Sequence, residues 1–137
     1  LKLYELRREP TMREARNWMI GFFPTSPQDI MQAMVNPHTS NHFRMAITYW
    51  DMACSLVNHG AIEAEMFADA NTEFIPYFAK IEPFLSELRQ MTNNPTFLHH
   101  LETFVMKQPD AKERLAASRE TMKRWMKARE EMTKAAS

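Results

Sequence analysis

The 137-residue sequence has little of several residue types on which particular protein classes depend. It contains one cysteine and two glycines, and its formal net charge is zero. A single cysteine excludes an internal disulfide framework. Sheets joined by tight hairpins need residues at positive φ, usually glycine, so two glycines argue against such sheets. No apolar run among these residues is long enough to cross a bilayer, and no secretory signal pattern is visible.

Catalytic and cofactor-binding motifs are also missing from the sequence. A phosphate-binding loop is excluded because it needs more glycine than the chain has, and no nucleophile-elbow motif occurs. The Glu-x-x-His pairs of di-iron helical bundles are absent as well. We therefore assign no catalytic, cofactor-binding or metal-binding residues, and we expect a protein that is not an enzyme.

The positions of proline, glycine and apolar residues predict a series of helices. Ser26 is a typical N-cap before Pro27 at the first helical position. Gly60 is a typical helix stop, and Pro83 predicts a kink or break near Glu82. The predicted helices cover residues 1–9, 10–20, 27–35, 40–59, 62–70, 73–91, a segment opened by Asn94-Pro95 that runs through Val105, and 110–136.

Residues 40–59 show the clearest helical periodicity in the chain. Apolar side chains recur there at steps of three and four residues, at Phe43, Ala46, Ile47, Trp50, Ala53, Cys54 and Val57. We expect this helix at the centre, with Trp18, Trp50 and the aromatic residues of 74–104 in the core. Cys54 is interpreted as a small buried hydrophobe rather than a reactive thiol. The predicted fold class is all-α, a single bundle-like domain of six to eight helices over residues 1–137.

The last predicted helix is long, about 27 residues or roughly 40 Å. Its apolar positions are few, and they are Ala111, Leu115, Met122, Trp125, Met126 and Met132. Charged residues dominate after position 126. We therefore expect a compact core over about residues 3–122 and a projecting helical tail over 123–137. A protein partner or a second copy of the chain could bind through this helix.

Charge is distributed unevenly although it sums to zero. Residues 1–20 carry five basic and three acidic side chains. Residues 21–109 carry four basic and nine acidic side chains, and residues 110–137 carry eight basic and five acidic ones. The simpler interpretation is that two terminal helices lie against a mildly acidic middle. A basic surface that faces phospholipid or nucleic acid is the alternative. Nucleic acid is disfavoured because the basic residues alternate with glutamates, as on a solvated helix.

Histidine pairs are the first candidates for chemistry. His38 and His42 are four residues apart, a spacing that can hold a metal within a helix, but Pro37 places His38 before the helix begins. His99 and His100 are adjacent and point to different faces, so we expect one against the core and the other in water.

Carboxylates and methionines are the remaining candidates. Asp51 and Glu102 lie on or near apolar helices and could form a buried acid pair; the alternative is that both face solvent at helix edges. The twelve methionines are scattered over nearly every helix, so we interpret them as core residues. A pocket lined by Met and Phe between helices is the alternative.

Two stretches resemble a family of uncharacterised bacterial all-helical proteins. The first runs from Leu3-Tyr4-Glu5-Leu6 through 12–16, and the second covers 49–62, with a later Glu82-Pro83-Phe84-Leu85. In many members of that family a membrane helix precedes the domain. The resemblance therefore implies a possible anchor before Leu1, and a location in the cytoplasm or at the cytoplasmic face of the inner membrane. It implies no activity and no site residues.

These observations favour a non-enzymatic interaction or regulatory module, tethered to a membrane if an anchor precedes Leu1. The alternative function is a small-molecule or lipid-binding helical domain with a pocket lined by Met and Phe. A hydrolytic enzyme that uses Asp51, Glu102 or a histidine ranks last.

Overall fold

A computed structural model describes residue 5 and residues 9–136, except for the side chain of Ala70. These residues form helices and no strand, which confirms the predicted all-α class. The predicted helix over 1–9 lies largely outside the described residues. The elements are α2 (Pro10–Ile20), α3 (Pro27–Val35), α4 (Ser40–Asn58), α5 (Ala64–Ala70), α6 (Phe74–Ile81), the short 3₁₀ helix η1 (Glu82–Phe84), α7 (Leu85–Met91), α8 (His99–Met106) and α9 (Ala111–Ala136).

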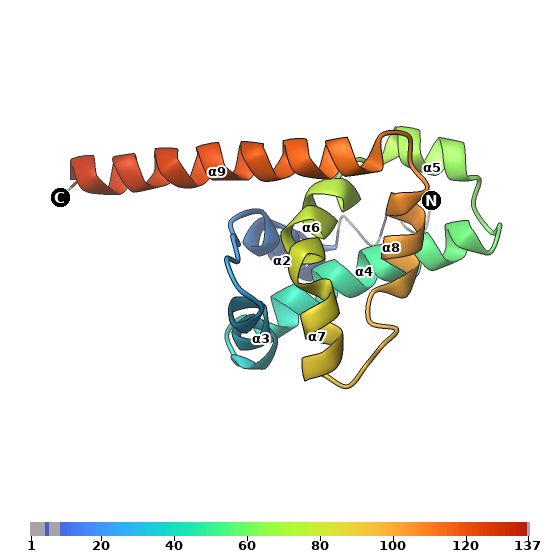
Figure 1. Cartoon of the computed structure of the whole chain (residues 1–137), viewed down its shortest axis with the longest axis horizontal. Coiled ribbons are helices and arrows are strands. Elements are labelled where there is room, and N and C mark those ends of the chain that lie inside the picture. Colours follow the sequence, from blue (N-terminus) through green and yellow to red (C-terminus); the bar gives the residue numbers. More distant parts are fainter. Residues whose placement is uncertain (1–4, 6–8, 137) are drawn as a thin grey trace.

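Helices α2 to α8 pack together into what is called here the body of the molecule. Helix α4 lies at its centre, as its periodicity predicts. Helices α2, α3, α5 and α8 all pack against it, while α6 packs against both α8 and α9. Figure 1 shows α9 crossing one edge of this body and continuing well beyond it. Within the described part of the chain, no helix is long and apolar enough to span a membrane.

Local signals set most helix ends where the sequence predicts them. Ser26 Oγ accepts the backbone N–H of Asp29 at 3.2 Å, with Pro27 in the first turn of α3. Gly60 adopts a φ of 83° just after α4, a conformation in which glycine has no steric cost. The break at Pro83 is confirmed, because α6 gives way to η1 at residue 82.

Two helix predictions are wrong in detail. Helix α8 starts only at His99, because Asn94 Oδ1 accepts the backbone N–H of Thr96 in a turn and Leu98 takes a left-handed φ of 58°. Helix α5 starts at Ala64 rather than at residue 62. Its Met66 side chain is 66% exposed and does not face the core.

Aromatic rings fill the centre of the body. The side chains of Trp50, Phe74 and Phe78 are fully buried, as predicted, and the Phe74 ring lies 6.0 Å from Trp50 and 5.3 Å from Phe104. Each buried ring of this kind contributes roughly 1.5–3 kcal/mol through the apolar surface it removes from water. Trp18 is only half-buried, at the edge of this core.

Cys54 and the methionines divide between core and surface. Burial, reinforced by the charge of Asp51, raises the pKa of the Cys54 thiol to about 12, so this thiol is an inert core residue as predicted. Met12 and Met19 are buried and match the core interpretation. That interpretation is wrong for five methionines that are exposed, and these are Met52, Met66, Met91, Met106 and Met132.

Candidate functional site

The histidines do not gather into a metal site. His38 lies exposed in the turn before α4, as predicted, whereas His42 lies within α4 with its ring 6.2 Å from that of Trp18. His99 is exposed and His100 is half-buried, 5.9 Å from the ring of His59. Among the residues that the structure describes, no three His, Cys, Asp or Glu side chains are grouped as a metal ion would require.

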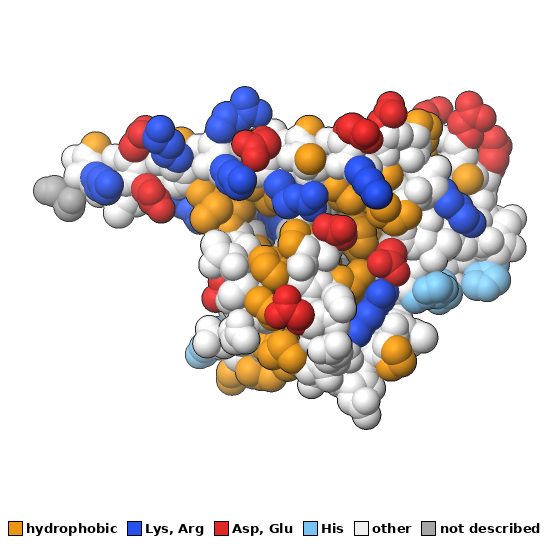
Figure 2. All heavy atoms as spheres, viewed as in Figure 1, with side chains coloured by type: hydrophobic (Ala, Val, Ile, Leu, Met, Phe, Trp, Pro, Cys, Tyr) orange, Lys and Arg blue, Asp and Glu red, His pale blue; other side chains and the backbone are white. Residues whose placement is uncertain are grey.

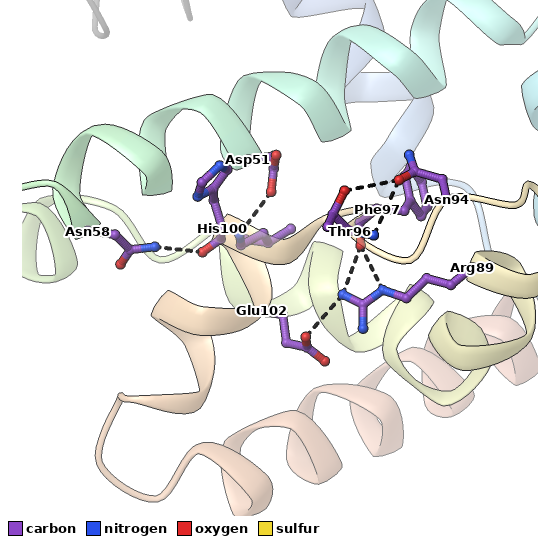
Figure 3. Close-up of polar contacts among 9 residues, drawn as sticks. Asp51, Asn58, Arg89, Asn94, Thr96, Phe97, His100 and Glu102 are labelled. Atoms are coloured by element: carbon purple, nitrogen blue, oxygen red, sulfur yellow. Dashed lines mark hydrogen bonds and ion pairs between the residues drawn. The ribbon is translucent and has the colours of Figure 1, made fainter.

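Asp51 and Glu102 make separate contacts with the backbone and with an arginine (Figure 3). Asp51 Oδ1 accepts the backbone N–H of Leu101 at 2.9 Å, so a carboxylate of α4 caps the first turn of α8. Glu102 forms an ion pair with Arg89 at 3.0 Å, and the same guanidinium donates twice to the backbone oxygen of Phe97. Both carboxylates therefore join helices of the body instead of forming an acid pair.

Two hollows flank α9 where it crosses the body, and they are the best candidate for a binding site. Phe23, Lys80 and Met122 line both of them. The larger hollow, called here the large groove, has a volume of about 470 Å³ and the smaller one, the small groove, about 230 Å³. Figure 2 shows hydrophobic side chains beneath the basic side chains of α9 in this region.

The large groove has one wall from the body and one from α9. The body contributes Ile20, Phe23, Thr72, Glu73, Pro76, Tyr77 and Lys80. The α9 wall consists of Ala117, Ser118, Thr121, Met122 and Trp125. The body wall is held in place because Arg16 of α2 binds both carboxylate oxygens of Glu73, at 2.9 and 2.6 Å, just before α6. This paired geometry raises the pKa of Arg16.

Lys80 lies at the boundary of the two grooves, and only 6% of it is exposed. Its Nζ donates to the backbone oxygens of Met19 and Ile20 at the end of α2, where the oxygen of Met19 also accepts the N–H of Phe22 at 3.2 Å. The ammonium also lies 5.0 Å from the centre of the Phe23 ring. Burial lowers the pKa of Lys80 to about 8, and the positive charge of Arg129 acts in the same direction.

Arg129 ties the outer half of α9 to the same place. Its guanidinium donates to the backbone oxygen of Gly21 at 3.2 Å and lies 4.8 Å from the centre of the Phe23 ring. Lys80 and Arg129 thus hold the end of α2 and the Phe23 ring from two different helices, an arrangement we call the cation clamp. Contact between α9 and the body therefore extends past residue 122, so the projecting part of the helix has a fixed direction.

Helix α9 has two apolar sides, one against the body and one exposed. Ala111 and Leu115 are buried against the body, with Met122 partly buried. Trp125 and Met132 are 56% and 73% exposed. They belong to an uncharged stripe along the helix, and its members are Ser118, Thr121, Trp125, Ala128, Met132 and Ala135. These residues alternate steps of three and four, which places them in one row.

Sequence reasoning missed Lys80, the cation clamp and the stripe. A lone lysine in the otherwise apolar α6 was a usable signal, because an unpaired lysine is rarely fully buried. The partners of Lys80 lie about 60 residues earlier in the chain, so the sequence offered no sign of what it binds.

The family comparison covers the body but not α9. A sequence model of the family described as Domain of unknown function (DUF4760) matches residues 1–108. The chain therefore belongs to this family. No curated protein and no solved structure shows a significant match. Helix α9, which begins at Ala111, lies beyond the matched residues.

Proposed function

We propose that this member of a domain family of unknown function is a non-enzymatic interaction module that binds a protein partner through α9. The observation that carries the proposal is the uncharged stripe, with Trp125 at 56% and Met132 at 73% exposure on a helix that continues past the body. Tryptophan and methionine are enriched at protein interfaces, and tryptophan often dominates their binding energy.

The cation clamp supports this proposal because it orders the binding surface before a partner arrives. Arg129 and Met122 fix α9 on the body, so the stripe is presented on a rigid element. A preordered surface loses less conformational entropy on association than a flexible one. The large groove lies directly beside the stripe and supplies a concave surface for part of the partner.

A photo-crosslinking amino acid in place of Trp125, introduced in cells, tests the proposal. The matched control carries the same amino acid at Met66, which has a comparable exposure on α5. We expect one discrete crosslinked protein at position 125 and none at position 66. Its identity comes from mass spectrometry, and Trp125→Ala should weaken binding of the purified partner by about 30-fold, the loss of a typical hot spot of 2 kcal/mol. Equal labelling at both positions would contradict the proposal.

We propose the cytoplasm as the location, or the cytoplasmic face of the inner membrane if an anchor precedes Leu1. This part of the proposal rests on the resemblance to bacterial proteins with a membrane helix before the domain. Cell fractionation of the untruncated gene product, before and after deletion of any segment ahead of Leu1, is the test. Recovery of both forms in the soluble fraction contradicts the tether.

The small groove favours a second candidate function, binding of an amphipathic anion such as a long-chain carboxylate. Phe23, Phe84, Met122 and Met126 provide its apolar lining, and the lining residues include three cations and no carboxylate. These cations are Lys80, Arg119 and Lys123, of which Arg119 pairs with Glu82 at 3.4 Å and Lys123 with Glu120 at 3.1 Å outside the lining. Calorimetric titration with a fatty acid and with the matching fatty alcohol tests this function. We expect only the acid to bind, and binding of neither ligand excludes it.

A further inference from the structure

We propose that the partner of α9 is a second copy of this chain, and that two α9 helices pair in antiparallel orientation through their uncharged stripes. The two-fold axis of this pair passes between residues 126 and 127. The inference rests on the proposed function, because it assigns the partner of the same surface. It is derived from side-chain size, from charge and from the groove beside the stripe.

Side-chain sizes along the stripe are complementary in this register. Steps of three and four residues are the pattern that keeps a row facing a partner helix in a coiled coil. Antiparallel pairing about the proposed axis sets Trp125 against Ala128 of the second copy and Met132 against Thr121 of the second copy. These two layers each combine a larger with a smaller side chain, the arrangement that fills space without clashes. The two-fold axis generates each layer twice, so the Trp125 side chain of each copy packs against Ala128 of the other.

Charges beside the stripe favour the antiparallel orientation over the parallel one. Arg124 and Glu131 flank the stripe on one side, and Arg129 flanks it on the other. Antiparallel pairing brings Arg124 next to Glu131 of the second copy, and the two-fold axis makes this contact twice. Parallel pairing would bring Arg124 next to Arg129 of the second copy, which is repulsive in both places. It would also stack Trp125 on its own counterpart.

The large groove is placed to receive the end of the second helix. In the antiparallel register, Met132 and Ala135 of the second copy lie over Thr121 and Ser118, which belong to the α9 wall of this groove. The opposite wall offers apolar surface, including Ile20 with 45% of its area exposed. The second helix is therefore enclosed by the body as well as by α9, which buries more apolar surface than contact between two isolated helices.

Charge exchange across the proposed contact is the decisive experiment, with self-association measured by sedimentation equilibrium over a dilution series. We expect the wild-type chain to dimerise. Arg124→Glu should weaken the dimer by about tenfold or more, because it creates two contacts between like charges. The double variant Arg124→Glu with Glu131→Arg should restore association. Lys127→Glu is the matched control, since it makes the same change of charge on α9 away from the stripe, and it should leave the dimer unchanged.

Each of the following results overturns the inference of antiparallel self-pairing. A stronger dimer in Arg124→Glu would indicate the parallel orientation, because the carboxylate introduced at position 124 would then face Arg129. A wild-type chain that is monomeric at every concentration, or one that binds vesicles of anionic phospholipid without dimerising, also overturns it. If this monomer still crosslinks from position 125 to a different protein, the proposed function stands and only self-pairing fails. If it crosslinks to nothing, both proposals fail. Circular dichroism of each variant checks that the helices remain folded.

Discussion

The two sides of α9 have similar residue types and different surroundings. The inner side carries Leu115 at 1% exposure, and the stripe carries Met132 at 73%. Both are large apolar side chains on the same continuous helix. The difference arises because α6 packs against the inner side of α9, whereas Met132 lies on the part of the helix that continues past the body. Apolar character alone therefore does not determine burial, since a facing surface must also exist. Four substitutions can break or sharpen this comparison.

The largest expected effect is on the inner side. Leu115→Ala should lower the free energy of unfolding by about 2–5 kcal/mol, because it removes buried methyl groups and leaves a cavity beneath α9. Chemical denaturation followed by circular dichroism measures the loss. A change of less than about 1 kcal/mol would mean that α9 is not part of the cooperative fold.

The next effect concerns Lys80 and pH. The folded-state pKa of Lys80, about 8, lies below its ordinary value of 10.5, so the unfolded chain binds more protons between these values. The free energy of unfolding should therefore rise as the pH increases from about 8 to 10, and this gain should disappear when the pH returns to 8. Relative to Lys80→Met, which lacks this titration, the rise should be of order 2 kcal/mol. If the free energy of unfolding changed with pH in the same way for the wild-type chain and for Lys80→Met over this range, the prediction would be contradicted.

Arg129 tests whether the cation clamp sets the direction of the projecting helix. Arg129→Gln removes the contact with the Phe23 ring and weakens the bond to Gly21, at an expected cost of about 1 kcal/mol. Amide hydrogen exchange over residues 124–134 should become faster, while exchange in α4 stays unchanged. Lys127→Gln provides the control on the same helix. Equal exchange in both variants would show that the clamp does not order α9.

The smallest effect on folding is expected on the stripe. Met132→Ala should change the unfolding free energy of the monomer by less than about 0.5 kcal/mol, because its side chain lies mostly in water. The same substitution should weaken self-association, since Met132 enters the large groove of the second copy. Denaturation at low protein concentration and sedimentation separate the two quantities. A large loss of monomer stability would show that the stripe already packs within one chain.

Local chemistry explains which parts of the fold were predictable. Ser26 with Pro27, Gly60 and Pro83 act on the backbone within a few residues, so their effects follow from the sequence. The start of α8 did not follow, although Asn94 and Pro95 are good capping residues. Arg89 binds the backbone oxygen of Phe97 from another helix, and Leu98 takes a left-handed conformation there. Contacts of this kind depend on tertiary structure.

The candidate site was less predictable than the fold for the same reason. The sequence contains the spacing of Trp125 and Met132, but only the position of α6 shows which side of α9 remains exposed. The bonds of Lys80 to α2 likewise join segments that only the folded chain brings together. Asp51 and Glu102 were interpreted as a possible acid pair or as solvent-facing residues, and each instead joins two helices.

The uninterrupted length of α9 has a geometric consequence for any paired form. At 1.5 Å per residue, the antiparallel register separates Leu115 of one copy from Leu115 of the other by about 23 residues, or roughly 35 Å along the helices. Such a pair would hold the two bodies at a fixed distance from each other, with the bodies facing opposite directions along the helix axis.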